Sequence, residues 1–217
     1  PEQLGVIARA SSMRYKGTEV PLARIAQELG IDYFLEGSVD NEVSFTEIFN
    51  GQVGLRIGTP DDDTRPDVVV SNTEIYNMSL AGMLAFTSDI EVTNTLIYNC
   101  GNYMFGGFAG GNYSLTHCTF SNEPALFVQD EPTVQFSDNI VIGENELLTA
   151  DLSVEMTNCI VWGTADDELL INNGGGANIS LSLISNIIRS GQEIANNFTS
   201  QEFNFPGFLD AFSNDYH

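Results

Sequence analysis

Short stretches of alternating apolar and polar residues recur about every 22 residues between positions 41 and 217. Six residues mark the repeat: Asn50, Asn77, Asn99, Asn122, Gly143 and Gly163. The position seven before each marker is apolar, and the column reads Val43, Val70, Val92, Leu115, Phe136 and Met156. The next position carries a hydroxyl in every repeat: Ser44, Ser71, Thr93, Thr116, Ser137 and Thr157. This alternation predicts half-buried strands whose apolar column faces inward and whose hydroxyl column faces solvent.

A polar column lies directly after the hydroxyl column, five positions before the markers. Its members are Phe45, Asn72, Asn94, His117, Asp138 and Asn158. Asparagine and aspartate tolerate a left-handed backbone, which a tight bend between two strands requires. Stacked amides also hydrogen-bond from one strand to the next. We therefore predict an asparagine ladder at a bend that every repeat shares.

The remaining strand of each repeat follows the marker. We expect it in Val53–Ile57, Met83–Phe86, Ala125–Val128 and Glu168–Ile171. A seventh repeat centres on Asn186, with Ile179 and Ile184 facing inward and Leu181 at the ladder position. Short strands at this period predict coils that bury their apolar faces only when stacked. The predicted fold class is all-β, a right-handed parallel β-helix of about seven coils over residues 41–217.

Residues 1–40 follow a different pattern, namely strand, helix, strand. Leu4–Arg9 is apolar and extended, Pro21 opens a helical pattern that Gly30 ends, and Tyr33–Val39 reads as a second strand. Two runs, LGVIARASSMRYKGT from Leu4 and IAQELGIDYFLEGSV from Ile25, resemble the TolB-like amino-terminal domain of bacterial adenylate cyclases and tetratricopeptide proteins. The resemblance implies a short β-α-β fragment, which we expect to cap the open end of the first coil.

The repeats themselves resemble right-handed β-helix proteins of the Bacteroidota surface and secreted type. Besides the columns, the resemblance is carried by Asn158-Cys-Ile-Val-Trp-Gly163 and by Phe205-Pro-Gly-Phe-Leu-Asp210. It implies an extracellular or cell-surface location, and it implies no particular activity.

The charge of the chain restricts its partners. The formal net charge is −23, and the basic residues after position 40 are Arg56, Arg65 and Arg189. Such a surface repels nucleic acids and anionic membranes, and no apolar run reaches the roughly 18 residues that a membrane span needs. No cofactor is predicted. Calcium is the one ion left open, at Asp61, Asp62 and Asp63 in the insertion 59–66, against the alternative of a solvated acidic loop.

Two carboxylates are candidates for glycoside hydrolysis. Glu47 and Glu74 share a column on adjacent coils, roughly 5 Å apart at strand spacing, which suits a retaining pair. The alternative, two solvated outward acids, is favoured. A lyase is disfavoured because the repeats contain no lysine and only scattered arginines, and His117 is better explained as a bend residue.

Aromatic residues form a second candidate site. Tyr76, Tyr98 and Trp162 share one column that faces outward, and Phe49 lies at its start. Exposed rings on a flat sheet could stack on sugars. The alternative, rings packed beneath a loop or beneath the amino-terminal fragment, is equally supported.

The three cysteines do not form a disulfide framework. Cys118 and Cys159 share a column, and the alignment of markers places them two coils apart, about 9.6 Å at strand spacing. This exceeds the roughly 7 Å limit for a disulfide. We therefore predict buried free thiols, with no partner for Cys100.

These observations leave three hypotheses about function. The leading one is a noncatalytic extracellular or cell-surface protein that binds a polysaccharide or a surface partner. The second is a carbohydrate-active enzyme, which requires converging carboxylates in a groove. The third is a chimeric or truncated chain without a single function, because both resemblances begin or end abruptly.

Overall fold

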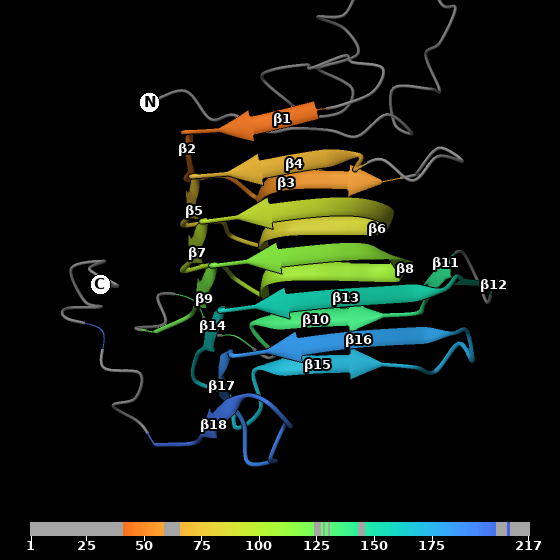
Figure 1. Ribbon diagram of the computed structural model, residues 1–217. Helices are drawn as coiled ribbons and strands as arrows, with labels where there is room; N and C mark the ends of the chain where they lie inside the picture. The colour runs from red at the N-terminus through yellow and green to blue at the C-terminus, as the bar shows by residue number, and fades with distance from the viewer. Residues whose placement is uncertain are drawn as a thin grey trace, which may run out of the picture.

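The computed structural model describes residues 41–58, 66–123, 131–142 and 146–202, together with the single residues 127, 129 and 208. These residues form eighteen short strands, and the part of the chain described contains no helix. The strands stack as coils from β1 at one end to β18 at the other (Figure 1). The predicted right-handed parallel β-helix is confirmed for this part of the chain. Residues 1–40, with the predicted β-α-β fragment and its capping role, lie outside the described residues.

Each complete coil has three faces, and the first is the one seen from the front in Figure 1. Face 1 consists of β1 (Asn41–Ser44), β4 (Val68–Ser71), residues 88–93 of β6 (Ala81–Thr93), residues 111–116 of β8 (Tyr103–Thr116), β13 (Leu152–Thr157) and β16 (Ile179–Ile184). All neighbours on this face pair in parallel.

The other two faces complete the coils. Face 2 consists of β2 (Glu47–Phe49), β5 (Glu74–Tyr76), β7 (Leu96–Tyr98), β9 (Thr119–Ser121), β14 (Ile160–Trp162), β17 (Ile187–Arg189) and β18 (Phe198–Ser200). Face 3 consists of β3 (Val53–Gly58), residues 81–86 of β6, residues 103–108 of β8, β10 (Val134–Ser137) and β15 (Leu169–Asn172). The strands β6 and β8 therefore turn the corner from face 3 to face 1. We number the coils by their face 1 strands: coil 1 begins with β1 and coil 6 with β16.

A single left-handed residue forms the corner between face 1 and face 2. Its φ angle lies between 48° and 59° in all six coils, at Phe45, Asn72, Asn94, His117, Asn158 and Ser185. The Nδ2 of Asn94 donates to Oδ1 of Asn72 at 2.7 Å, and Nδ2 of Asn158 lies 3.0 Å from Nε2 of His117. The predicted ladder is confirmed, because one residue per corner must be left-handed and asparagine accepts that backbone best among residues with a side chain.

The repeat assigned to the marker Gly143 was wrong. The strand β10 pairs with Phe105–Gly107 of β8 on face 3 and not with face 1. Beyond it, β11 (Asn139–Ile142) and β12 (Glu146–Thr149) form an antiparallel hairpin that leaves the coil. Asp138 therefore belongs to the root of this hairpin, and Val141 in β11 is 63% exposed. The alternation misled the alignment because strands of face 3 are half-buried in the same way as strands of face 1.

The last repeat is displaced by four residues from the predicted register. Ile184 pairs with the outward Thr157 and is 46% exposed, and Leu181 lies within β16 instead of at the bend. Ser185 occupies the corner, and the Asn186 side chain points into the core. Of the predicted third strands, the first two are confirmed and the last begins one residue later, at Leu169. Residues 125, 126 and 128 lie outside the described residues.

The core runs along the axis of the stack. All three faces contribute aliphatic side chains, such as Val70, Ile75 and Met83 of coil 2, none of which is exposed. Aromatic rings fill the middle, where Phe105 of coil 3 contacts Phe136 and Tyr113 of coil 4 with ring centroids 5.4 and 5.7 Å apart. Because each coil shares its core with its neighbours, the stack holds all three faces rigidly in place.

Candidate functional site

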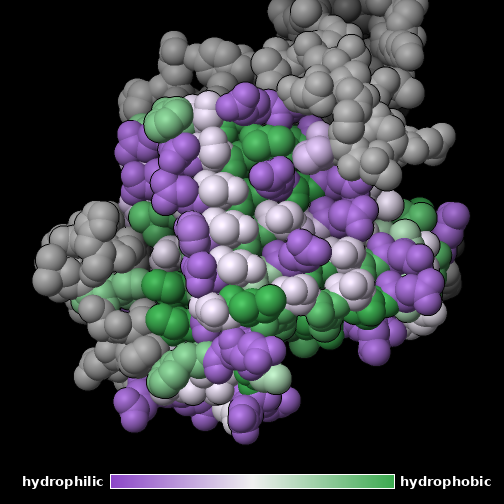
Figure 2. Space-filling model, in the orientation of Figure 1, coloured by the Kyte–Doolittle hydropathy of each residue, from purple (hydrophilic) through white to green (hydrophobic). Residues whose placement is uncertain are grey.

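Face 1 presents a flat polar surface to solvent. Its hydroxyl column contains Ser44, Ser71, Thr93, Thr116 and Thr157, all partly exposed and in register. A parallel column two residues earlier contains Glu42, Val69, Glu91, Ser114, Glu155 and Ser182. Figure 2 shows side chains of intermediate hydropathy in rows down the middle of this face, with hydrophilic ones among them. Ser137, predicted to belong to the hydroxyl column, is instead buried on face 3.

The predicted aromatic column exists on face 2, but its rings present edges to solvent. Phe49 stacks on Tyr76 with centroids 5.2 Å apart and an interplanar angle of 10°, and Tyr76 stacks on Tyr98 at 5.0 Å and 8°. The rings therefore cover one another's faces, and the Tyr98 side chain is only 2% exposed. A sugar ring stacks on an aromatic face, so this arrangement favours the packing alternative. Sugar binding by this column stays an untested prediction.

The carboxylates of Glu47 and Glu74 hold this aromatic stack. The two residues are strand partners on adjacent coils, as predicted. The Tyr76 hydroxyl donates to Oε1 of Glu47 at 2.9 Å, and the Tyr98 hydroxyl donates to Oε1 of Glu74 at 2.9 Å. Burial and the Glu47 carboxylate raise the pKa of Tyr76 to about 12, so its hydroxyl stays a donor at neutral pH. These contacts give both glutamates a structural role, and their catalytic role stays untested.

Trp162 is not exposed, contrary to the prediction for the aromatic column. Its register partner on coil 4 is Ser121, so it does not continue the stack that ends at Tyr98. The guanidinium of Arg189, one coil further on, lies over the indole with Cζ 5.7 Å from the ring centroid. Trp162 is fully buried, and a ligand on this side of the ring would have to displace Arg189.

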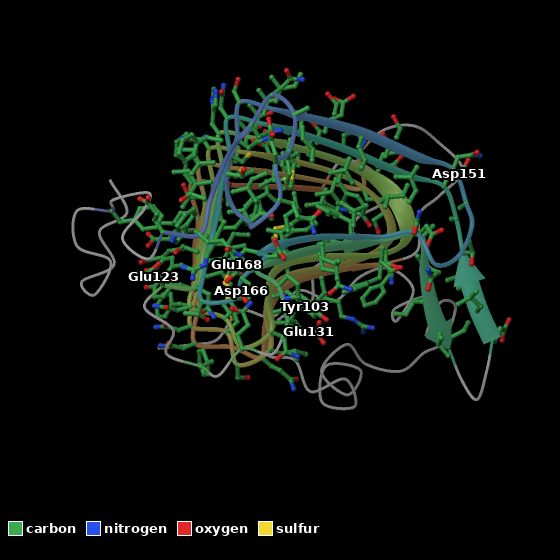
Figure 3. The ribbon with its side chains drawn as sticks, turned by 90° about the horizontal axis from the view of Figure 1, so that it is seen from below. Tyr103, Glu123, Glu131, Asp151, Asp166 and Glu168 are labelled. Atoms are coloured by element: carbon green, nitrogen blue, oxygen red, sulfur yellow. The ribbon has the colours of Figure 1, made fainter. Side chains whose placement is uncertain are left out.

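Arg189 belongs to an acidic corner between face 2 and face 3 that the sequence did not predict as a site. Two glutamates near this guanidinium, Glu123 and Glu168, lie at that corner together with Asp166 and Tyr103 (Figure 3). Burial raises the pKa of Glu123 above its ordinary value, although the nearby Arg189 opposes the shift.

Glu168 is a structural residue of this corner. It is not exposed, and burial raises the pKa of its carboxyl group although several donors oppose the shift. The Thr133 backbone N–H donates to Oε2 at 2.8 Å, and the Ala165 N–H donates to Oε1 at 2.6 Å. Both oxygens therefore fix loops that join face 2 to face 3. A carboxylate so enclosed cannot reach a polymer in solvent, whereas Glu123 is a partly exposed acid beside Arg189.

The hairpin β11–β12 projects from the corner between face 3 and face 1 (Figures 1 and 3). The aliphatic side chains of Val141 and Leu147 lie opposite each other and are 63% and 50% exposed. Asp138 anchors its root: the N–H groups of Gly175 and Ala177 donate to the carboxylate at 2.9 and 3.0 Å. Burial opposes ionisation of Asp138, but these donors and Asn139 lower its pKa below the ordinary value.

The described residues contain no group of three or more histidine, cysteine, aspartate or glutamate side chains placed to hold a metal ion. Asp61, Asp62 and Asp63, the candidate calcium ligands, lie outside the described residues, so that prediction is untested. In the part of the chain that the structure describes, no helix has the length and hydropathy of a membrane span.

Three faces, one-residue corners and an axial core define a β-helix solenoid. The family described as the right handed beta helix region matches residues 29–149, more than half of the chain. The protein therefore belongs to this family. No curated protein and no solved structure matches the chain.

Proposed function

We propose that the protein is a noncatalytic binding module of the extracellular or cell-surface type, and that it holds a neutral polysaccharide on face 1. The observation that carries the proposal is the hydroxyl column, which runs in register across five coils. Successive hydroxyls stand about 4.8 Å apart. Each can donate and accept one or more hydrogen bonds, as the hydroxyls of a sugar chain require.

Charge favours a neutral ligand. The net charge of −23 repels polyuronates and other polyanions, and exposed acids such as Glu91 and Glu155 lie beside the hydroxyl column. The proposal for face 1 replaces the aromatic column as the preferred surface, because the rings of that column offer their edges. The absence of a catalytic step is supported by the tyrosine contacts of Glu47 and Glu74 and by the enclosed position of Glu168.

The test is retention of the purified protein in gels that contain neutral glucans, xylan or mannan, with a polyuronate as the charged comparison. We expect retention by at least one neutral polymer and none by the polyuronate. The double variant Thr93→Val/Thr116→Val should weaken retention about tenfold, because it removes two hydroxyls and keeps the side-chain shape. Thr119→Val/Thr149→Val is the matched control, since its threonines lie on face 2 and on the hairpin.

The same samples distinguish the enzymatic alternative. New reducing ends in the presence of the native protein, abolished by Glu123→Gln, would replace the binding proposal by a hydrolase whose acid lies at the acidic corner. Loss of retention in the control variant, or no retention by any neutral polymer, would contradict binding on face 1.

A further inference from the structure

One inward column carries a small polar side chain in every coil, directly after the corner between face 1 and face 2. Its members are Thr46, Thr73, Thr95, Cys118, Cys159 and Asn186. In the threonines, the hydroxyl donates to the carbonyl two residues earlier, at 2.8 Å for Thr73 and 3.0 Å for Thr95. The two thiols occupy the same place, with Sγ 3.3 and 3.4 Å from the carbonyls of Thr116 and Thr157. Cysteine therefore takes the place of threonine in this inward column, which we call the capping column because each hydroxyl or thiol contacts the carbonyl two residues earlier.

Cys118 and Cys159 lie on adjacent coils, and the sequence prediction that placed them two coils apart was wrong. The register pairs Thr119 with Ile160, so the cysteines that precede them are neighbours across the stack. The backbone N–H of Cys118 lies 3.5 Å from Sγ of Cys159, and each cysteine is 1% exposed. The error came from the Gly143 repeat, because the hairpin inserts residues between coils 4 and 5 without adding a coil.

We propose that Cys118 and Cys159 form a disulfide when the protein folds in an oxidising compartment, and that this bond ties coil 5 to coil 4. Neighbouring strands stand about 4.8 Å apart, within the 4.4–6.8 Å range of Cα separations in disulfides. The two residues are 41 positions apart, and the segment between them contains the hairpin. Among the described strands, this is the one segment between consecutive coils that forms a hairpin of its own. The bond would join the two coils on either side of that hairpin. The inference is independent of the proposed function.

The reaction balances as a thiol–disulfide exchange with a small disulfide such as oxidised glutathione. The Cys159 thiolate attacks the small disulfide and releases one glutathione thiolate, which takes up a proton. The Cys118 thiolate then attacks Sγ of the mixed disulfide and releases the second glutathione. In the folded protein, the hydrogen bond from Cys118 lowers the pKa of Cys159, and the same bond raises the pKa of Cys118 together with burial. Both protein thiols are oxidised, and one disulfide is reduced to two thiols.

The experiment refolds the full chain from urea in oxidised and reduced glutathione and counts thiols in the denatured product. We expect a fall from three thiols to one, which is Cys100, a buried thiol on the face 2–face 3 side of coil 3. The linked peptides must be mapped with chymotrypsin, because no lysine or arginine separates the three cysteines. Oxidation should raise Tm by roughly 5–10 °C, and reductant should reverse the change.

Two variants make the result specific. Cys118→Thr places at this position the residue that Thr95 provides one coil earlier. This variant should fold, keep both remaining thiols free and show no rise in Tm on oxidation. Cys100→Ala should retain the linkage and leave no free thiol. Folded wild-type protein with three free thiols, a linkage that includes Cys100, or glutathione adducts without a linkage would each overturn the proposal.

Discussion

The first three coils and the three that follow use one plan of strands with different side chains. In coils 1–3 the inward capping column is all threonine, and the connections from face 2 to face 3 are short, such as the one from Tyr98 to Tyr103. In coils 4–6 the same column reads Cys118, Cys159 and Asn186, and the hairpin projects from the chain between coils 4 and 5. The acids of the acidic corner and Arg189 also belong to this second region.

This difference between the two regions shows which corners of the coil tolerate inserted residues. The corner between face 1 and face 2 is a single left-handed residue in all six coils. A second residue there would move every side chain of the following strand to the opposite side of the sheet. The corner from face 3 to face 1 accepts both the insertion after Gly58 and the hairpin after Ser137. A loop at this corner can grow outward into solvent without changing the pairing on either side.

The largest expected effect on stability is in the aromatic core that joins the two regions, compared with a ring on the surface. Phe105→Ala should lower the free energy of unfolding by about 3–5 kcal/mol, because the ring is fully buried against three rings of coil 4. Phe86→Ala is the control, since Phe86 is a partly exposed ring on face 3. Urea unfolding measures both changes. Equal losses would show that the aromatic cluster does not join the two regions.

Replacing Asp138 tests whether the second region, coils 4–6 with the hairpin, depends on the hydrogen bonds at the root of the hairpin. Asp138→Asn should lower Tm by roughly 4–8 °C at neutral pH, because an amide cannot accept from all the donors at the hairpin root. The pKa of Asp138 in the folded protein lies below the ordinary value of about 3.9 for an unfolded chain. The stabilisation by this carboxylate is therefore complete above the unfolded pKa, and it is lost as the pH falls through the folded pKa. The difference in Tm between wild type and variant should therefore shrink in acid.

Asp151→Asn provides the comparison for this measurement. Asp151 lies at the other end of the hairpin, is exposed, and accepts from the N–H of Asn178 at 3.0 Å. Its replacement should change Tm less than the Asp138 substitution does. A pH-independent difference between wild type and Asp138→Asn would contradict the electrostatic account of the anchor.

The regular region could be predicted from the sequence because each position of a coil has one physical demand. The left-handed corner selects asparagine, the inward positions select aliphatic side chains, and the outward ones select hydroxyls, so Asn72, Val70 and Ser71 align without structural information. The hairpin could not be predicted in this way. The strand before it, Val134–Ser137, alternates between apolar and polar as the strands of face 1 do, and alternation does not tell which sheet a strand joins.

The candidate sites were harder to predict than the fold. The register of Glu47 with Glu74 followed from the repeat, but their hydrogen bonds to tyrosines depend on side-chain directions. The buried Trp162 lies beneath Arg189, which the misplaced seventh repeat had set in another column. The pairing of Cys118 with Cys159 was missed because the Gly143 repeat added one coil to the alignment, and this doubled the expected distance between them.

A smaller effect is expected where the ladder begins. Phe45 holds the left-handed corner of coil 1 with φ 50° and is 83% exposed. Phe45→Asn should raise the free energy of unfolding by about 1 kcal/mol, because asparagine adopts this backbone at lower cost and its amide can bond to Asn72. Asn94→Ala, in the middle of the ladder, should lower it by a similar amount. If Phe45→Asn is destabilising, the phenyl ring has a contact that the ladder does not replace.

The smallest effect on stability is expected at the tip of the irregular region. Val141→Thr/Leu147→Thr should change the free energy of unfolding by less than about 0.5 kcal/mol, because both side chains are at least half exposed. The same variant should bind less of a dye that reports exposed apolar surface, whereas Leu170→Thr/Phe198→Thr, 41% and 53% exposed on the coils, should reduce dye binding less. The Val141 and Leu147 side chains lie opposite each other on one side of the hairpin, so they form a continuous apolar patch, and the two control residues lie on different faces. A large loss of stability in the hairpin variant would mean that these side chains pack within the protein, and the hairpin would then be part of the core that the coils share.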